Sequence, residues 1–354
     1  GAIYFLLLLL PSTMLHAAFT EVQPDPVLVA KYKEMFNGRK YLNLEYQNLK
    51  TSDAIAIGAV LESNNTLTSF RVLFADFGNL GWAAVAKGIA HNQVLQNLDL
   101  TNIAMNEGSI ETFRRAMAIN KTLITLDFCN NQIGALEMKI LAPALNSTSG
   151  LTELYIRSNE IGDGGMEALA DSLKFNPPLK LLNLGANRIG PEGGKCLASA
   201  LKENRNLEKL YLSENRIGDE GAKAVADALR LNSTLRTLDV RHNKITIDGG
   251  QAFIVALGAN YTLTNLGLLG NDTSKVERHI DKLLSENHIL AELRNLPPGQ
   301  LAKDYPFILE LFLSAGELPN ELILLISTAA AALEQVSRQI FWAKSYYPAI
   351  IDVF

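Results

Sequence analysis

The hydrophobic positions of this chain repeat every 28 residues over most of its length. The clearest copy is Leu151-x-x-Leu154-x-Ile156-x-x-Asn159-x-Ile161, in which alternating apolar residues end at an asparagine. The position of that asparagine, here called the anchor, recurs at Gln47, Ala75, Ile103, Asn131, Asn159, Asn187, Asn215, Asn243 and Asn271. The residue eight places before the anchor is leucine in every copy except the first, which has Arg39. A register kept over this length predicts nine stacked structural units.

Each unit combines a strand pattern with a helix pattern. The alternation before the anchor predicts a short strand. After the anchor, spacings of three and four, as in Val225, Ala226 and Leu229, predict one buried face of a helix. Asp163 and Asp219 are predicted to cap their own helices. Two further sets mark the turns: Gly162, Gly190 and Gly218, predicted to use positive φ before the helix, and Asn176, Asn204, Asn232 and Asn260, predicted to adopt left-handed geometry after it.

The anchor asparagines have a predicted physical role. After each strand the chain turns inward and leaves buried backbone groups without partners, and an asparagine amide can both donate and accept there. Ala75 and Ile103 cannot do this, so we expect the early repeats to be less regular. The last full unit is one residue short, and Leu290 and Leu293 are predicted to begin a tenth, partial strand.

These units resemble the ribonuclease-inhibitor-type leucine-rich repeats, which also occur in NOD-like receptors and in the Ran GTPase-activating protein. The resemblance covers about residues 39–295 and implies an α/β fold, a right-handed leucine-rich-repeat horseshoe solenoid. Because stacked strands lie about 4.8 Å apart while helices need roughly 10 Å, such a stack must curve. The parallel sheet is therefore predicted on the concave face and the helices on the convex face.

The two ends of the chain depart from the repeat. Residues 1–19 form an apolar leader, whose run Ala2–Leu10 is typical of a signal peptide, a membrane anchor or a packed apolar cap. Residues 20–38 are predicted to form an N-terminal cap with a helix from Val27 to Phe36. Residues 296–354 are predicted to form a helical C-terminal cap or a partner-binding extension. Either apolar end could associate with a membrane, so a secretory or membrane route follows if the leader is real, and a cytoplasmic location otherwise.

Composition and candidate chemistry narrow the function classes. The net charge of −5 argues against nucleic acid as the ligand, because phosphate binding needs concentrated Lys and Arg. Cys129, Cys196 and the five histidines show no metal-ligand spacing. The segment Gly190–Lys195 departs from a phosphate loop at its first glycine and its final Ser or Thr. We therefore expect no cofactor, no metal and no catalytic activity.

The concave face is the predicted binding surface. Side chains that flank the strand leucines should point toward it, and tyrosine and arginine dominate binding hot spots. The predicted partner-binding residues are Tyr155, Arg157, Tyr211, Asp239 and Arg241. The resemblance implies a protein partner, so the leading hypothesis is a protein–protein interaction scaffold. The alternative is a regulator of a small GTPase that resembles the Ran GTPase-activating protein, because a solenoid can speed hydrolysis by ordering the GTPase's own residues.

Overall fold

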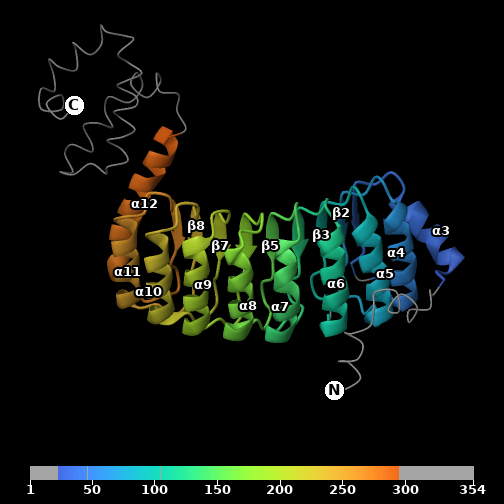
Figure 1. The fold of residues 1–354 in the computed structure, drawn as a ribbon, viewed down its shortest axis with the longest axis horizontal. Coiled ribbons are helices and arrows are strands. Elements are labelled where there is room, and N and C mark those ends of the chain that lie inside the picture. Colours follow the sequence, from blue (N-terminus) through green and yellow to red (C-terminus); the bar gives the residue numbers. More distant parts are fainter. Residues whose placement is uncertain (1–22, 46, 104, 295–354) are drawn as a thin grey trace, which may run out of the picture.

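The strands form one parallel sheet whose order follows the sequence (Figure 1). The structure, a computed structural model, describes residues 23–45, 47–103 and 105–294. The strands are β1 (Tyr41–Asn43), β2 (Ser69–Arg71), β3 (Asn97–Asp99), β4 (Thr125–Asp127), β5 (Glu153–Tyr155), β6 (Leu181–Asn183), β7 (Lys209–Tyr211), β8 (Thr237–Asp239) and β9 (Asn265–Gly267). Each strand pairs with the next at an offset of one repeat, so that Leu154 lies opposite Leu182. The predicted leucine-rich-repeat solenoid is confirmed.

The helices form a second layer that lies along one face of the sheet (Figure 1). They are α3 (Pro26–Phe36), α4 (Thr51–Ser63), α5 (Gly78–His91), α6 (Glu107–Ile119), α7 (Ala135–Leu141), the 3-10 helix η1 (Ala142–Asn146), α8 (Gly162–Lys174), α9 (Pro191–Glu203), α10 (Gly218–Leu229), α11 (Ile247–Leu257) and α12 (Ser274–Arg294). Helix α3 confirms the predicted N-terminal capping helix, and the Asp25 side chain accepts a hydrogen bond from the backbone N–H of Val27 at 2.8 Å. None of the helices within the described ranges is long and apolar enough to cross a membrane.

One continuous hydrophobic core fills the space between the two layers, from α3 to α12. The repeated leucines supply most of it, because Leu151, Leu154 and Ile156 are each no more than 2% exposed. Each such burial stabilises the fold by about 1.5–3 kcal/mol. In the early repeats the core also contains aromatic rings. Phe113 and Phe128 contact each other edge to face, with 5.0 Å between the ring centres.

The anchor asparagines form a hydrogen-bonded ladder between repeats, as predicted. The Asn215 Oδ1 accepts from the backbone N–H groups of Asn187 and Ile189, both at 2.9 Å. Its Nδ2 donates to the carbonyls of Leu184 and Leu212 at 2.9 and 2.8 Å. The other anchors that bond the preceding repeat through both ends of the amide are Asn131, Asn159, Asn187, Asn243 and Asn271.

A second asparagine ladder runs along the ends of the helices, where left-handed geometry was predicted. That prediction holds for Asn176, with φ 56°, but is wrong for Asn204, which is extended at φ −70° and ψ 131°. It is also wrong for Asn232 and Asn260, neither of which has a positive φ. Asn204 needs no left-handed turn, because its buried side-chain amide bonds the backbone at the end of the helix. Asn232 Nδ2 donates to the Leu201 carbonyl at 2.8 Å, and its Oδ1 accepts from the backbone of Leu235 at 2.8 Å. Equivalent bonds to the preceding repeat come from Asn92, Asn120, Asn204, Asn260 and Asn287.

The predicted caps Asp163 and Asp219 act one repeat further on. Each lies inside the first turn of its own helix, so the prediction that it caps that helix is wrong. Asp163 Oδ1 instead accepts from the backbone N–H groups of Gly190 and Gly193, at the start of α9, at 2.6 and 2.9 Å. The repeat that contains α9, which Asp163 caps, begins its helix without a left-handed residue. The predicted positive φ occurs at Gly162 and Gly218 but not at Gly190, which is extended at φ −98°.

The irregular parts of the solenoid differ from those expected. Ala75 and Ile103 do not disturb the strands, because the register continues from β1 through β4. The irregularity falls instead on α7, a short helix that continues as the 3-10 turns of η1. The predicted tenth strand at Leu290 and Leu293 is wrong, since α12 runs through both positions as one helix to Arg294. The leader and the C-terminal extension lie outside the described residues.

Candidate functional site

The parallel register brings the predicted binding residues onto four adjacent strands. Tyr155 lies opposite Asn183, Asn183 opposite Tyr211, and Tyr211 opposite Asp239. Two residues further along, Arg157 and Arg241 follow β5 and β8 on the same face of the sheet. All five predicted side chains thus belong to one surface, which we call the β5–β8 patch: Tyr155, Arg157, Tyr211, Asp239 and Arg241.

Within this patch, Asp239 positions Arg241. The carboxylate is only 5% exposed, and its Oδ1 accepts from the Arg241 backbone N–H at 3.0 Å and from Nε at 2.9 Å. Its Oδ2 accepts from Nη2 at 2.7 Å. The hydrogen bond and charge of Asp239 raise the pKa of Arg241 further above its usual range. Both Asp239 oxygens therefore bond Arg241 in a buried position, whereas the half-exposed guanidinium remains on the surface.

The column that holds Asp239 has a structural pattern that the sequence reading missed. Asp99, Asp127 and Asn183 occupy the same position, and each side chain accepts from the backbone N–H two residues later. Such local bonds explain why short acidic or amide residues recur there. Tyrosine, arginine and glycine cannot make this side-chain bond, so Tyr155 and Tyr211, like Arg71 and Gly267, are not explained by it.

Tyr155 presents a neutral hydroxyl and a partly buried ring. Its hydroxyl donates to Glu153 Oε2 at 3.2 Å. Burial, followed by the charge of Glu153, raises the pKa of Tyr155 to about 12, so the phenol stays protonated at neutral pH. Tyr211 is also half-buried, two strands away. Aromatic side chains held in this way lose little freedom on binding, which suits them as contact residues.

Arg157 crosses the intervening strand to reach β7. Its Nη2 lies 2.6 Å from Glu214 Oε1, and its Nη1 donates to Ser213 Oγ at 3.3 Å. The guanidinium passes over Gly185, where an added Cβ would lie 2.6 Å from Nη1. The hydrogen bond and the charge of Arg157 lower the pKa of Glu214. Glu214 was not predicted, because no sequence signal links residues two repeats apart.

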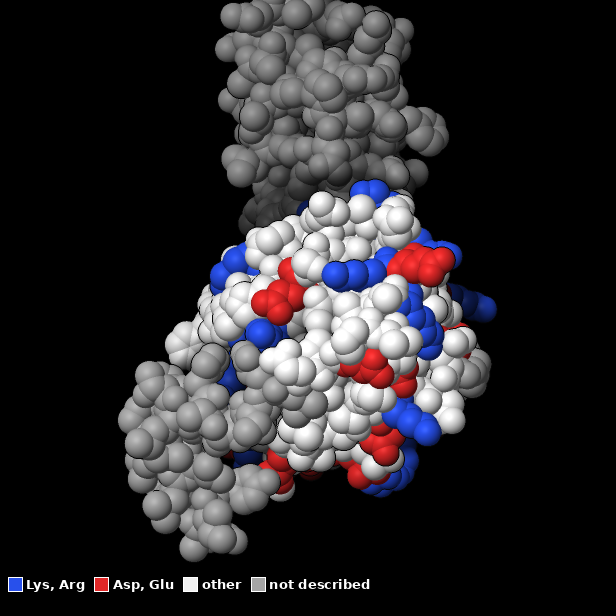
Figure 2. All heavy atoms as spheres, turned by 90° about the vertical axis from the view of Figure 1, so that its right-hand side faces the viewer, with Lys and Arg blue, Asp and Glu red and all other residues white. Residues whose placement is uncertain are grey.

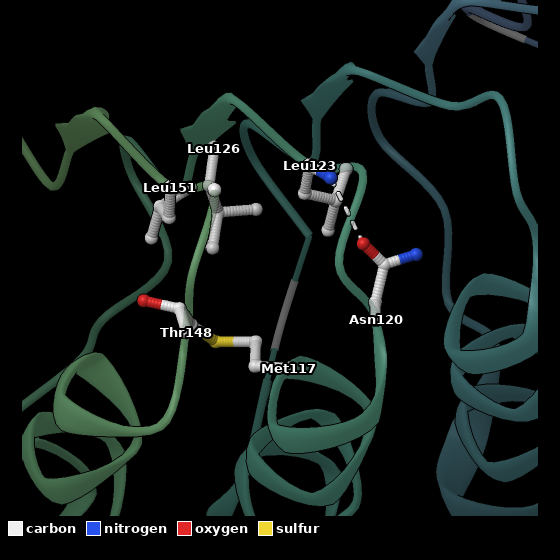
Figure 3. A pocket seen from close by; sticks show the side chains of 7 residues that line it. Met117, Asn120, Leu123, Leu126, Thr148 and Leu151 are labelled. Carbon is white, nitrogen blue, oxygen red and sulfur yellow. Dashed lines mark hydrogen bonds between the residues drawn. The ribbon is translucent and has the colours of Figure 1, made fainter. Parts of the chain in front are cut away.

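Metal ions and reactive thiols are two common means of catalysis, and the described residues favour neither. They contain no cluster of His, Cys, Asp or Glu that could hold a metal ion. Burial, followed by a hydrogen bond to Asp127, raises the pKa of the Cys129 thiol, which disfavours the nucleophilic thiolate. The cavity in Figure 3 is about 10 Å³, the size of a single water. It is lined by Met117, Asn120, Leu123, Leu126, Thr148, Gly150 and Leu151.

Away from the sheet, charge is mixed. Figure 2 looks onto the end of the solenoid that carries α3, where basic and acidic side chains alternate without a large area of one sign. The convex face follows the same rule: Lys195 on α9 lies 2.8 Å from both Glu192 and Glu220. Such exposed pairs contribute little to stability and keep the surface soluble.

Comparison with known proteins agrees with the repeat architecture. The family model described as "Leucine Rich repeat" matches residues 151–170, 175–198, 203–226 and 231–253. None of the curated proteins matches the chain. These matches cover the four units that begin with β5, β6, β7 and β8, the strands that carry the patch.

Several solved structures are similar to parts of the chain. The actin-binding site 2 of leiomodin-1 is 24% identical with a TM-score of 0.40, covering 45% of this chain and 90% of that one. The tropomodulin C-terminal domain of Caenorhabditis elegans is 11% identical with a TM-score of 0.37, covering 54% and 98%. The yeast complex of Rad7 and Elc1 is 14% identical with a TM-score of 0.43, covering 72% and 70%.

Proposed function

We propose that this chain, a leucine-rich-repeat protein, is a non-catalytic protein-binding scaffold whose partner docks on the β5–β8 patch. The observation that carries the proposal is the register of β5 to β8, which sets two tyrosines and two arginines on the same sheet face, opposite the helices. Tyrosine and arginine are enriched among residues that dominate binding energy, and they cluster at the centre of interfaces.

The patch is preorganised for binding. Asp239 holds the Arg241 guanidinium through two side-chain hydrogen bonds, and Glu214 and Ser213 hold that of Arg157. Side chains that are already ordered lose less conformational entropy when a partner binds. The backbone beneath them is fixed by the asparagine ladder, so the patch behaves as a rigid template.

The test is quantitative affinity capture with the full chain, comparing the wild type with a Tyr211→Ala, Arg241→Ala double variant. A matched control removes an exposed aromatic and an exposed cation from the helical layer, Phe175→Ala with Lys202→Ala. We expect the patch variant to lose specific partners by at least about tenfold, which corresponds to roughly 1.4 kcal/mol, while the control retains them. An unchanged set of partners in the patch variant would remove the concave patch from the account.

A further inference from the structure

We infer that the partner of the β5–β8 patch is acidic: a protein segment that sets carboxylates against Arg157 and against a row of cations beside the patch. This inference rests on the proposed function and adds the chemistry of the partner. The row, here called the basic ridge, consists of Arg188, Arg216 and Lys244, each of which directly follows an anchor asparagine.

The repeat places the ridge beside the patch. Its members occur on three successive units, in the turns that follow β6, β7 and β8. Arg188 pairs with Glu160, with Nη2 and Oε1 2.8 Å apart. Arg216 and Lys244 are exposed, and neither forms an ion pair with any residue that the structure describes. Two cations at this rim therefore lack an ion-pair partner among the described residues, and the exposed Asp272 ends the row at the equivalent position of the next unit.

The units of β6 to β8 differ in charge from those of β1 to β4 on the concave surface. Five positions of each repeat face it or its rim: the first and third strand residues, the second and third residues after the strand, and the residue after the anchor. Over β6 to β8 these positions hold five basic residues (Arg188, Lys209, Arg216, Arg241 and Lys244) and two acidic ones (Glu214 and Asp239). The flanking unit of β5 holds Arg157 with Glu153 and Glu160, and that of β9 holds Asp272, so the basic excess is confined to β6 to β8. Over β1 to β4, the described positions hold Arg71 against four acidic residues, Glu45, Asp76, Asp99 and Asp127. In a chain of net charge −5, this basic excess over β6 to β8 is a local feature.

The acidic residues of the β6 to β8 units already form ion pairs with arginines. Asp239 is buried beneath Arg241, and Glu214 is bound by Arg157. The Glu214 side chain is 52% exposed, so its carboxylate occupies a place on Arg157 that an incoming carboxylate can also reach. An exposed ion pair is worth little in water, so exchanging Glu214 for a partner's carboxylate costs little. Glu214 is then an internal competitor for the partner.

The charge pattern favours a protein over a nucleic acid. Duplex DNA carries a negative charge about every 1.7 Å along its axis. A nucleic acid that lay along the sheet would therefore also place phosphates on the acidic residues of β1 to β4. A folded protein or peptide can confine its carboxylates to the region of the ridge. The neighbouring tyrosines supply apolar contact that such a segment can use.

Binding of fluorescent peptides to the full-length chain tests the inference. The probes are short peptides rich in Glu and Tyr, matched peptides in which every Glu is replaced by Gln, and an oligouridine as a polyanion that is not a protein. The ridge variant is Arg216→Gln with Lys244→Gln. The control, Lys33→Gln with Lys202→Gln, loses the same charge on α3 and α9, away from the sheet.

We expect the Glu peptides to bind and the Gln peptides to bind about tenfold more weakly or worse. The ridge variant should bind the Glu peptides about tenfold more weakly, with less dependence on salt, and the control should stay within about twofold. Glu214→Gln should strengthen binding, because it removes the competitor from Arg157.

Three results would overturn the inference. In the first, the Glu and Gln peptides bind equally well or both fail to bind. In the second, the ridge variant binds the Glu peptides as well as the wild type does. In the third, the oligouridine binds more tightly than the Glu peptides. A partner that is lost with Tyr211→Ala and Arg241→Ala, yet is indifferent to the ridge variant and to Glu214→Gln, would refute an acidic partner and leave the proposed function intact. If both the Tyr211→Ala, Arg241→Ala variant and the ridge variant keep every partner, that result would instead count against the proposed function.

Discussion

Replacing Asn215 with alanine tests the asparagine ladder at its best-formed step. The change removes five hydrogen bonds to the backbone, two of which satisfy the N–H groups of Asn187 and Ile189. Alanine leaves a space in a site that is only 4% exposed at Asn215 and fully buried at Ile189. Water has little access there, so those backbone groups lose their partners.

The magnitude follows from the number of groups left unsatisfied. A buried donor or acceptor without a partner costs roughly 1–3 kcal/mol. Two N–H groups, together with the carbonyls that also lose Nδ2, therefore predict a loss of about 3–5 kcal/mol. Because a solenoid behaves as a chain of nearest-neighbour contacts, the damage should concentrate at the junction between the units of β6 and β7.

The assay combines denaturant unfolding, followed by circular dichroism, with hydrogen exchange at the Asn187 and Ile189 amides. Asn271→Ala is the matched control, since Asn271 accepts from two backbone N–H groups in the same way but is half-exposed. Water can replace its bonds, so the control should cost less than about half as much. A loss below about 1 kcal/mol for Asn215→Ala, or an equal loss for both variants, would refute the reasoning.

Three further predictions follow from contacts between repeats. Gly185→Ala should displace the Arg157 guanidinium and raise the pKa of Glu214 toward its ordinary value in an NMR titration, at a stability cost below about 1 kcal/mol; an unchanged Glu214 pKa would contradict this. Asp219→Asn should cost about 1 kcal/mol at neutral pH, because Asp219 caps α11. Burial opposes ionisation, but hydrogen bonds from Thr246 lower the pKa of Asp219. The contribution of Asp219 to stability is therefore present above pH about 4 and is lost as the pH falls further. A difference in the free energy of unfolding between wild type and variant that grows in acid would contradict this. Cys129 should react with iodoacetamide at pH 8 more slowly than a free thiol, and rapid alkylation in the folded protein would refute the assigned burial.

The periodic features were predictable because each depends on one repeat at a time. The strand positions, the capping helix α3 and the anchor role of residues such as Asn159 follow from spacing and from the hydrogen-bonding capacity of the side chain. The grouping of Tyr155 and Tyr211 on one surface also follows, since a parallel register of whole repeats fixes which positions become neighbours.

Features that join one repeat to another could not be predicted in this way. Asp163 caps a helix in the following unit, and Arg157 reaches Glu214 across an intervening strand at Gly185, where the missing Cβ leaves room for the guanidinium. Spacing within a unit carries no information on such reach. Asp239 was predicted as a contact residue, but its oxygens are used by Arg241, a detail that depends on side-chain geometry.

Site-directed photocrosslinking tests the central claim most directly. A benzoylphenylalanine at position 211 replaces an aromatic residue at the centre of the β5–β8 patch, and the same residue at position 202 of α9 reports on the helical layer. We predict that a partner protein crosslinks through position 211 and not through position 202. Crosslinking through position 202 alone, or equally through both positions, would contradict it.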